Sequence, residues 1–473
     1  MDSHLGKLKS SYDVVVIGGG LGGLTAAHYL GKLGHNVLLL EQHHQLGGLA
    51  TWFKRPGGHI FDVSLHGFPV GMVKSCRKYW SPAIADAIVQ LPRIRFVNPQ
   101  FSLETSFTRQ DFSRLLVEDF HIPSPTIESF FDQLRQMNFY DHPTESIREI
   151  FEKFFPQRDD VHRFLLEPIA YANGSTLEDP AISYGIVFSN FMSQGVYTFQ
   201  GGTDTLIGAM TRELSAHGVD IRLRCPVEEI LMDTSSPTPS VCGVRVGGTA
   251  IPCRAVISNA NVLKTLTDYL PASALEEDLK EQSRRVRINT SSCQVYLGIR
   301  SGETLPDIGD LIFFSENEHF DSRELLDFHT KSRTFSLYYP RTRPRREPRY
   351  AIVASTNARW EDWNALDEIS YQKEKKRLIE DTLGALETLI PGIRNQIDWA
   401  EAATPKTFHR YTGHPRGTSF GTKFEGLYLS MHLPEQIRGL YHTGSVGIIM
   451  SGWLGAMNYG VIVAHKVAGA LHS

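Results

Sequence analysis

The chain of 473 residues carries 48 Lys and Arg residues against 52 Asp and Glu residues, a formal net charge of −4. Hydrophobic residues make up 41% and charged residues 21%, the composition of an ordinary folded protein, which excludes global disorder. The near-neutral balance argues against a nucleic-acid-binding protein, which would carry a basic excess, and the length suggests about three structural units.

The chain has five scattered cysteines and no Cys-x-x-Cys pair. This pattern indicates neither a disulfide framework nor a zinc site, so we predict no metal site and a reducing compartment. Residues 1–13 are polar and lead directly into a strand, without the apolar stretch of a secretory signal. We therefore expect a cytoplasmic protein that contacts a membrane only peripherally.

The N-terminal unit has the pattern of a strand, a helix and a second strand. Residues 14–17 form a short apolar run typical of a buried parallel strand. Residues 24–33 predict a helix that ends at Gly34, and residues 36–40 predict the second strand. This is the order of a βαβ unit.

The turn between the first strand and the helix contains Gly18-x-Gly20-x-x-Gly23, a complete dinucleotide-binding fingerprint. Gly18 permits a tight turn, Gly20 lets the backbone approach a pyrophosphate, and Gly23 lets the helix pack against the sheet. The helix N-terminus offers unpaired N–H groups to the phosphates. Glu41, at the end of the second strand, is placed to accept hydrogen bonds from ribose hydroxyls.

The fingerprint alone does not distinguish NAD from FAD. Gly47 and Gly48 extend the glycine-rich surface beyond what an NAD domain needs, which favours FAD. No second fingerprint occurs in the sequence, so we do not expect NAD(P)H to reduce a bound flavin. We expect a diffusible electron acceptor, such as oxygen or a quinone, or a redox-neutral reaction.

Residues 71–194 have a mostly helical pattern and are rich in Phe. Apolar side chains recur at helical spacing after the Ser124-Pro125 pair and again after Pro143. Two interpretations stay open. The segment forms core helices, or it forms an apolar lobe that caps a greasy pocket or touches a membrane.

The remainder of the chain mixes helices and strands. A helix is expected over 204–216, followed by strands at 219–224, 227–233, 241–246 and 254–258. Further strands are expected at 290–299, 311–315, 334–339 and 350–356, and then a long amphipathic helix whose apolar face spans 378–390.

Two segments leave their environment open. Residues 340–349 hold five arginines among three prolines, which predicts either a solvated loop between strands or docking on an anionic membrane surface. Residues 443–464 carry no charged side chain, and this uncharged segment is long enough to span a bilayer. Their many glycines favour instead a loop and a helix buried inside the protein.

Short motifs along the whole chain resemble the FAD-dependent amine-oxidase-like flavoproteins. They are most similar to the branch that contains phytoene desaturases, carotenoid isomerases and retinol saturases. Each motif is moderately specific, and their order and spacing together are strong. The motifs are DVVVIGGGLGGLTAAHYLGKLGHNVLLLEQHHQLGG at 13–48, Phe61-Asp62, Gly201-Gly202, CPVEEI at 225–230, AVISNAN at 255–261, ATPKTFHRYTGHPRGTSFG at 403–421 and GLYHTGSVGIIMSGWLGAMNYG at 439–460.

This resemblance implies an α/β fold. Its parts are a Rossmann-like FAD-binding domain of the glutathione-reductase type, which is a three-layer ββα arrangement, an α+β substrate domain and a helical lobe. The FAD-binding domain is expected to be discontinuous, over 1–70, 195–285 and 400–473. The helical lobe is expected over 71–194 and the substrate domain over 286–399.

The resemblance also implies FAD as the cofactor. Val227 is expected at the adenine. The last helix, which opens near Gly452, is expected to aim its N-terminal N–H groups at the pyrimidine edge of the flavin, where they would stabilise negative charge. The expected cofactor-binding residues are Gly18, Gly20, Leu21, Gly23, Glu41, Gly47, Gly48, Leu49, Val227, Asn259, Gly444, Ser445, Gly452, Trp453 and Leu454.

Three positions depart from the family's pattern. Leu49 stands where many members have Arg, and Ser64 replaces an expected glycine. Ser445 stands where an Asp often binds the ribityl chain. FAD is still expected, with reduced affinity or altered substrate chemistry.

No side-chain acid or base stands out. The weak candidates for proton transfer or substrate contact are His66, which matches a His of the saturase branch, and Arg410. A lone His is more often structural. An apolar substrate channel is expected to be lined by Tyr197, Phe199, Met450 and Trp453, with core packing as the alternative for each.

The resemblance implies an FAD-dependent oxidoreductase that acts on carbon–carbon bonds of a long apolar polyene or isoprenoid. The reaction would be desaturation, saturation or cis–trans isomerisation, by hydride transfer at flavin N5. A flavin amine oxidase is the alternative, although neither a Lys-bound water nor an aromatic cage can be identified. A non-catalytic flavin- or lipid-binding protein is a third hypothesis, and no nucleic-acid partner is expected.

Overall fold

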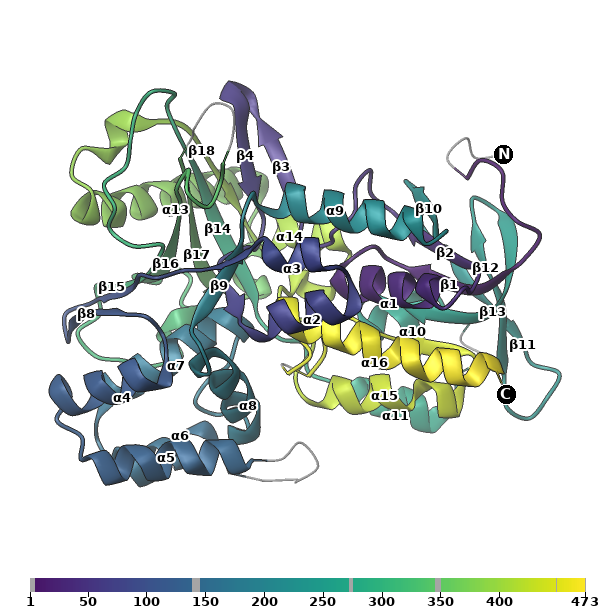
Figure 1. Ribbon diagram of the computed structural model, residues 1–473, viewed down its shortest axis with the longest axis horizontal. Helices are drawn as coiled ribbons and strands as arrows, with labels where there is room; N and C mark the ends of the chain where they lie inside the picture. Colours follow the sequence, from purple (N-terminus) through teal and green to yellow (C-terminus); the bar gives the residue numbers. More distant parts are fainter. Residues whose placement is uncertain (1–4, 138–144, 272–274, 345–349, 448, 473) are drawn as a thin grey trace.

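The computed structural model describes residues 5–137, 145–271, 275–344, 350–447 and 449–472. Figure 1 shows three regions: a first sheet with its covering helices, a second sheet backed by a long helix, and a lobe of helices below the second sheet in this view. The α/β fold expected from the sequence is confirmed.

The first sheet has the strand order β10-β2-β1-β13-β12-β11, and β19 also pairs with β13. Its parallel part is β10, β2, β1, β13 and β19, while β11 and β12 add an antiparallel meander to the long β13. Residues 14–17 and 37–41 are buried, as their apolar runs predict. The strands are β1 (Tyr12–Ile17), β2 (Val37–Glu41), β10 (Asp220–Leu223), β11 (Glu229–Asp233), β12 (Ser240–Val246), β13 (Thr249–Ser258) and β19 (Leu440–His442).

Helices α1 and α16 lie side by side in the layer that covers this sheet (Figure 1). They approach closely because both have glycine at the crossing. A Cβ on Gly460 would lie 2.4 Å from the carbonyl oxygen of Gly22. The helices of this region are α1 (Leu21–Lys32), α2 (Gly71–Tyr79), α3 (Pro82–Asp86), α9 (Thr203–Ala216), α10 (Val262–Asp268), α11 (Glu277–Arg285), α15 (Glu425–Gln436) and α16 (Gly452–His472).

The second sheet has the order β18-β14-β17-β16-β15-β7-β8. One of its faces packs its apolar side chains, such as Val295 and Leu297, with the buried face of α13. Its strands are β7 (Ile94–Val97), β8 (Ser102–Thr105), β14 (Ser291–Ile299), β15 (Leu311–Ser315), β16 (Ser332–Tyr338), β17 (Ala351–Ala358) and β18 (Ile397–Ala403). The accompanying helices are α12 (Trp360–Asn364), α13 (Glu368–Leu389) and α14 (Pro405–Thr412).

The helical lobe has its own core, rich in Phe. Phe112, Phe130 and Phe164 are fully buried in it. The lobe therefore forms core helices, as one of the two interpretations holds, and its α7 and α8 also border the main cavity. Its helices are α4 (Arg109–Glu118), α5 (Ser124–Gln136), α6 (Ile147–Phe154), α7 (Asp159–Asn173) and α8 (Ala181–Met192).

The lobe begins later than residue 71. Cys76 and Trp80, of α2 and its C-cap, are buried in the core of the first sheet, and β7 and β8 extend the second sheet. Two small sheets connect the regions. They are β3 (Trp52–Arg55) with β4 (His59–Asp62), and β5 (Phe68–Pro69) with β9 (Val196–Phe199) and β6 (Ile88–Gln90).

The arginine-rich segment is not simply solvated. Arg343 is buried and pairs with Asp62, with 2.6 Å between Nη2 and Oδ2. Asp62 also accepts a hydrogen bond of 2.7 Å from the backbone N–H of Thr203, so one carboxylate ties β4, the start of α9 and residue 343 together. Arg341 pairs with Asp310. The arginines at 345–349 lie outside the described residues.

The uncharged segment 443–464 forms a loop and the first turns of α16, much of it buried. Burial inside the protein, the interpretation that its glycines favour, agrees with this placement. Within the described ranges, the model contains no helix that combines the length and the apolar character needed to cross a membrane.

Candidate functional site

A cavity of about 1160 Å³ extends from the carboxyl ends of β1 and β2 to the second sheet and the helical lobe. We call the part lined by residues 17–22, 40–51 and 225–227 the dinucleotide end. We call the part lined by α7, α8, β14 and β17 the substrate end. The dinucleotide end has the position that open α/β sheets use for ligands, outside the carboxyl ends of their parallel strands.

The fingerprint glycines leave no room for side chains. Gly18 has φ of +96°, which favours glycine. A Cβ on Gly23 would lie 2.2 Å from the carbonyl oxygen of Gly18, and one on Gly20 would lie 2.8 Å from Nδ2 of Asn259. Gly18, Gly20 and Leu21 line the cavity, while Gly23 packs below it. The start of α1 therefore presents its backbone to the cavity.

Glu41 lies at the end of β2, lines the cavity and is only 6% exposed. Its Oε2 accepts a hydrogen bond of 2.7 Å from the N–H of Gly19, and its Oε1 accepts one of 2.8 Å from the N–H of His43. These bonds fix the carboxylate. A carboxylate has about four acceptor positions, so it retains capacity for ligand hydroxyls.

The facing wall of the dinucleotide end comes from three further segments. Gly47 forms a bridge with Gly20, and Gly48 lies beside it. Val227 and Asn259 also line the cavity. Segments far apart in the sequence thus meet around the start of α1.

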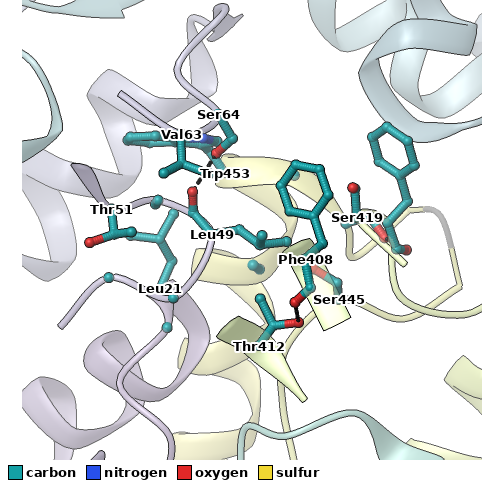
Figure 2. A pocket seen from close by; sticks show the side chains of 18 of the residues that line it. Leu21, Leu49, Thr51, Val63, Ser64, Phe408, Thr412, Ser419, Ser445 and Trp453 are labelled. Carbon is teal, nitrogen blue, oxygen red and sulfur yellow. Dashed lines mark hydrogen bonds between the residues drawn. The ribbon is translucent and has the colours of Figure 1, made fainter. Parts of the chain in front are cut away.

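The N-terminus of α16 borders the same cavity, which is lined by Gly444, Ser445, Gly452, Trp453 and Leu454. Figure 2 shows Ser445 and Trp453 with Leu21 across from them. Beside this loop, the hydroxyl of Thr443 is buried and has no hydrogen-bond partner among the described residues.

These groups suit a ligand with phosphates and hydroxyls. They are the hydroxyl of Thr443, unpaired among the described residues, the backbone N–H groups that the start of α1 presents to the cavity, and the fixed carboxylate of Glu41. The residues present therefore fit FAD.

Two of the three departures from the family pattern contact each other. The hydroxyl of Ser64 donates to the carbonyl oxygen of Leu49, with 2.8 Å between the oxygens (Figure 2). Both residues line the cavity. The Ser64 side chain thus binds the loop that carries Leu49.

The substrate end has one polar wall and one apolar wall. Strand alternation directs the polar side chains to the sheet face opposite α13. They are Ser292, Gln294, Tyr296, Thr334, Ser355 and Asn357. The facing wall comes from α7 and α8, with Pro168, Ile169, Val187 and Phe191, while Leu311 and Phe313 of β15 add apolar side chains to the sheet side.

His66 lies in this polar region and is fully engaged. Its Nδ1 is 2.8 Å from the Ser336 hydroxyl, and its Nε2 is 3.2 Å from both Gln294 Nε2 and the Ser355 hydroxyl. Because the Gln294 Oε1 accepts from the Tyr296 hydroxyl, its Nε2 must donate to His66. His66 therefore carries its proton on Nδ1. Burial lowers its pKa to about 4, which keeps it neutral.

Three of the expected residues do not line the cavity. Tyr197 and Phe199 pack with the core of the first sheet, whereas Val196 lines the cavity, because alternate residues of β9 face opposite sides. Arg410 is exposed on α14, and its neighbours Thr407 and Phe408 face the cavity instead. The expected roles of these three residues are therefore wrong. Met450 and Trp453 do line it.

Residues at both ends were not predicted. Cys225 and Tyr269 line the dinucleotide end; Cys225 opens the CPVEEI motif without having been expected at the cofactor, and no motif contains Tyr269. At the substrate end a signal was present, because Ser292, Gln294 and Tyr296 alternate with apolar residues along β14. That period of two would have identified a polar sheet face.

Comparison with known proteins gives a family and two kinds of relatives. The model of a family described as flavin containing amine oxidoreductase matches residues 21–470. A chloroplastic prolycopene isomerase of Daucus carota is 24% identical, with coverage of 97% of this chain and 80% of that protein. An all-trans-retinol 13,14-reductase of Danio rerio is 24% identical, with coverage of 95% and 85%.

Solved structures share the fold. An oxidoreductase from Methanosarcina mazei superposes with a TM-score of 0.68 at 17% identity, covering 98% of this chain and all (100%) of that one. Putrescine oxidase bound to putrescine gives a TM-score of 0.66 at 14% identity, covering 98% and 99%. At these identities the likeness establishes the fold alone.

Proposed function

The chain belongs to the family of flavin containing amine oxidoreductases, and from this premise we propose that its substrate is a long apolar polyene or isoprenoid. As a member of the family it is an FAD-dependent oxidoreductase. Carotenoid- and retinoid-converting enzymes are similar to nearly its whole length, which supports action on carbon–carbon bonds. The proposed reaction is desaturation, saturation or cis–trans isomerisation.

The residues of the dinucleotide end would hold the cofactor. The start of α1 would bind the pyrophosphate, Glu41 the ribose hydroxyls, and Val227 would pack on the adenine. Gly444, Ser445 and the start of α16 would contact the flavin half. When bound, FAD supplies the transfer of a hydride to or from carbon.

One observation carries the substrate proposal: the cavity continues past the start of α16 to an apolar wall of helices. Val187, Phe191 and Ile169 belong to this wall. An extended apolar chain gains about 0.8 kcal/mol for each CH₂ group that it buries, so such a wall binds a polyene well.

The polar wall opposite sets the orientation. Gln294, Ser355 and Asn357 offer hydrogen bonds at one side of an otherwise apolar space. These side chains are hydrogen-bonded within the protein and keep further donor or acceptor positions, so the wall can also accept a hydroxyl or carbonyl at one end of the substrate. His66 holds this wall in place as a positioning residue through its bonds to Gln294, Ser336 and Ser355.

The test uses purified protein in two states: with its flavin reduced under anaerobic conditions, for saturation or isomerisation, and with its flavin oxidised in air, for desaturation or amine oxidation. All-trans-retinol and prolycopene are supplied separately, and the extracts are separated by chromatography. A new isomer, or a product that differs by two hydrogens, supports the proposal. Turnover of putrescine or benzylamine with no change in either polyene would instead make the protein an amine oxidase. Flavin binding without turnover of any of these would favour the non-catalytic carrier.

The electron acceptor and the membrane contact are parts of the same proposal. The sequence contains no second dinucleotide fingerprint, which supports a diffusible acceptor such as oxygen or a quinone. The low solubility of a polyene in water supports collection of the substrate at a membrane surface. Oxygen uptake with and without an added quinone tests the first part, and co-sedimentation with anionic liposomes tests the second.

A further inference from the structure

Away from the cavity, α1 and the end of α9 bring together His28, Glu213 and His217. One ligand atom from each lies within 4.8 Å of the other two. Nε2 of His28 is 3.9 Å from Oε2 of Glu213. Glu213 and His217 are four positions apart in the sequence, so helical spacing places them on the same side.

The ring nitrogens of His28 lie near the Glu213 carboxylate, at 3.9 Å, and the backbone of Tyr79, and among the described residues neither makes a well-formed hydrogen bond. The His28 side chain is 0% exposed. Its ring stacks on Trp80, with centroids 4.2 Å apart and planes 4° apart, which fixes the ring plane. A buried imidazole with a fixed ring plane and no well-formed hydrogen bond can direct a nitrogen lone pair to a metal ion.

His217 is oriented by the backbone. Its Nδ1 lies 2.8 Å from the carbonyl oxygen of Glu213 and donates a proton to it, which leaves the lone pair of Nε2 free. In metal-binding histidines, such a hydrogen bond from the ring nitrogen that does not bind the metal fixes the orientation of the ring. Gly31 allows the close approach of α1, since a Cβ there would lie 3.1 Å from the carbonyl oxygen of His217.

We propose that His28, Glu213 and His217 bind one Zn²⁺ ion or a similar divalent transition metal, with water as the fourth ligand. Two imidazoles and one carboxylate are a donor set that zinc prefers. Metal–ligand bonds of about 2.0–2.2 Å require ligand atoms roughly 3.4 Å apart, so small side-chain rotations are enough. Glu213 and His217 are partly exposed, which gives the ion and the water an entry path.

The ion has a structural role, because it ties the end of α9 to α1. His28 lies eight residues after Gly20, which is about 12 Å along the helix, so the site is separate from the dinucleotide end. No metal site was predicted from the sequence, because its scattered cysteines have no zinc-binding spacing. A chain that brings two histidines and a glutamate together only on folding gives no such motif.

The test is a titration of the full-length chain, without an affinity tag, after removal of metals with a chelator. Co²⁺ alone is added and its visible absorbance followed, and Zn²⁺ is then added to displace it. The variants Glu213→Gln and His217→Gln each remove one ligand at a partly exposed position. His432→Gln is the matched control, because Nδ1 of His432 contacts the carbonyl oxygen four residues earlier, on Tyr428, at the same 2.8 Å.

We expect one equivalent of Co²⁺ to bind to the unmodified chain and to His432→Gln. Each ligand variant should weaken this binding by more than about tenfold, and Zn²⁺ should raise the melting temperature of the unmodified chain but not of these two variants. Absence of saturable binding at millimolar Co²⁺ would overturn the proposal, and so would equal binding by all four proteins. Flavin content, measured in parallel, should not change, because the cofactor site is elsewhere.

Discussion

The two ends of the cavity are built from different parts of the polypeptide. At the dinucleotide end, glycines bring the backbone itself to the ligand, and a single fixed carboxylate, Glu41, adds specificity. At the substrate end, side chains from one sheet face and from two helices form the walls. A site built from backbone should lose its ligand when a substitution adds even one side-chain atom. A site built from side chains should lose binding or turnover gradually, according to how much of a side chain is removed.

The largest effect is expected at the dinucleotide end. Gly23→Ala places a Cβ 2.2 Å from the carbonyl oxygen of Gly18, so α1 must move away from the turn. We expect the purified variant to lose its flavin absorbance. Gly384→Ala is the control, since an added Cβ meets nothing within 4 Å in α13 and Ala stabilises a helix by about 1 kcal/mol. Normal flavin content in Gly23→Ala would contradict a backbone-built site.

Each end also has a buried neutral histidine nearby, His66 at the substrate end and His442 behind the loop of Asn259. Burial lowers the pKa of both to about 4 from 6.5, so the unfolded chain takes up protons first as the pH falls. Each neutral histidine therefore makes its full contribution to the free energy of unfolding above about pH 6.5. Roughly 3 kcal/mol of this contribution is lost for each histidine as the pH falls from 6.5 to 4.

The variant His442→Gln should show a flatter dependence of melting temperature on pH over this window than the unmodified chain. The partly exposed His432 provides the control through His432→Gln, whose curve should match that of the unmodified chain. Parallel curves for all three proteins would show that His442 does not contribute.

A third prediction sharpens the contrast at the polar wall. Gln294→Leu removes the donor to His66 and the acceptor of the Tyr296 hydroxyl. Unpaired buried groups cost about 1–3 kcal/mol each, so turnover of a polyene should fall roughly 10- to 100-fold while flavin content stays normal. Gln282→Leu on α11, at a partly exposed position that does not line the cavity, should leave both unchanged. Loss of flavin in Gln294→Leu would show that the two ends are not independent.

The smallest expected effect is on the apolar wall. Phe191→Ala enlarges the substrate end next to α8, and KM for a polyene should rise about tenfold with little change in kcat. Phe101→Ala is the control, because Phe101 packs against the lobe core and does not line the cavity. Equal KM values for both variants would mean that the substrate does not reach this wall.

The same contrast explains what the sequence could predict. Gly18, Gly20, Gly23 and Glu41 act through spacing along one strand, turn and helix, which a sequence shows directly. The apolar wall could not be distinguished from a core by sequence. Val187 and Phe191 are apolar residues at helical spacing, as is the core residue Phe130.

Two kinds of error came from orientation. Tyr197 and Phe199 were assigned to the cavity on residue type, but the phase of β9 turns them to the core and leaves Val196 at the surface of the cavity. Arg410 was assigned from its motif, but it lies on the outer side of α14. Side-chain direction depends on the register of neighbouring elements, which a single sequence does not reveal.

The dinucleotide end around the start of α1 is completed by residues that follow β19 and by α16, from the far end of the sequence. Figure 1 shows α16 beside α1. Contacts over such sequence separations form late in folding, because long stretches of chain must be ordered first. During synthesis, the fingerprint leaves the ribosome early, yet its partners Gly444 and Gly460 leave it among the last residues of this sequence. Cofactor capture is therefore expected only after residues 440–460 have been synthesised, and chains that stop before α16 should stay empty and open to proteolysis.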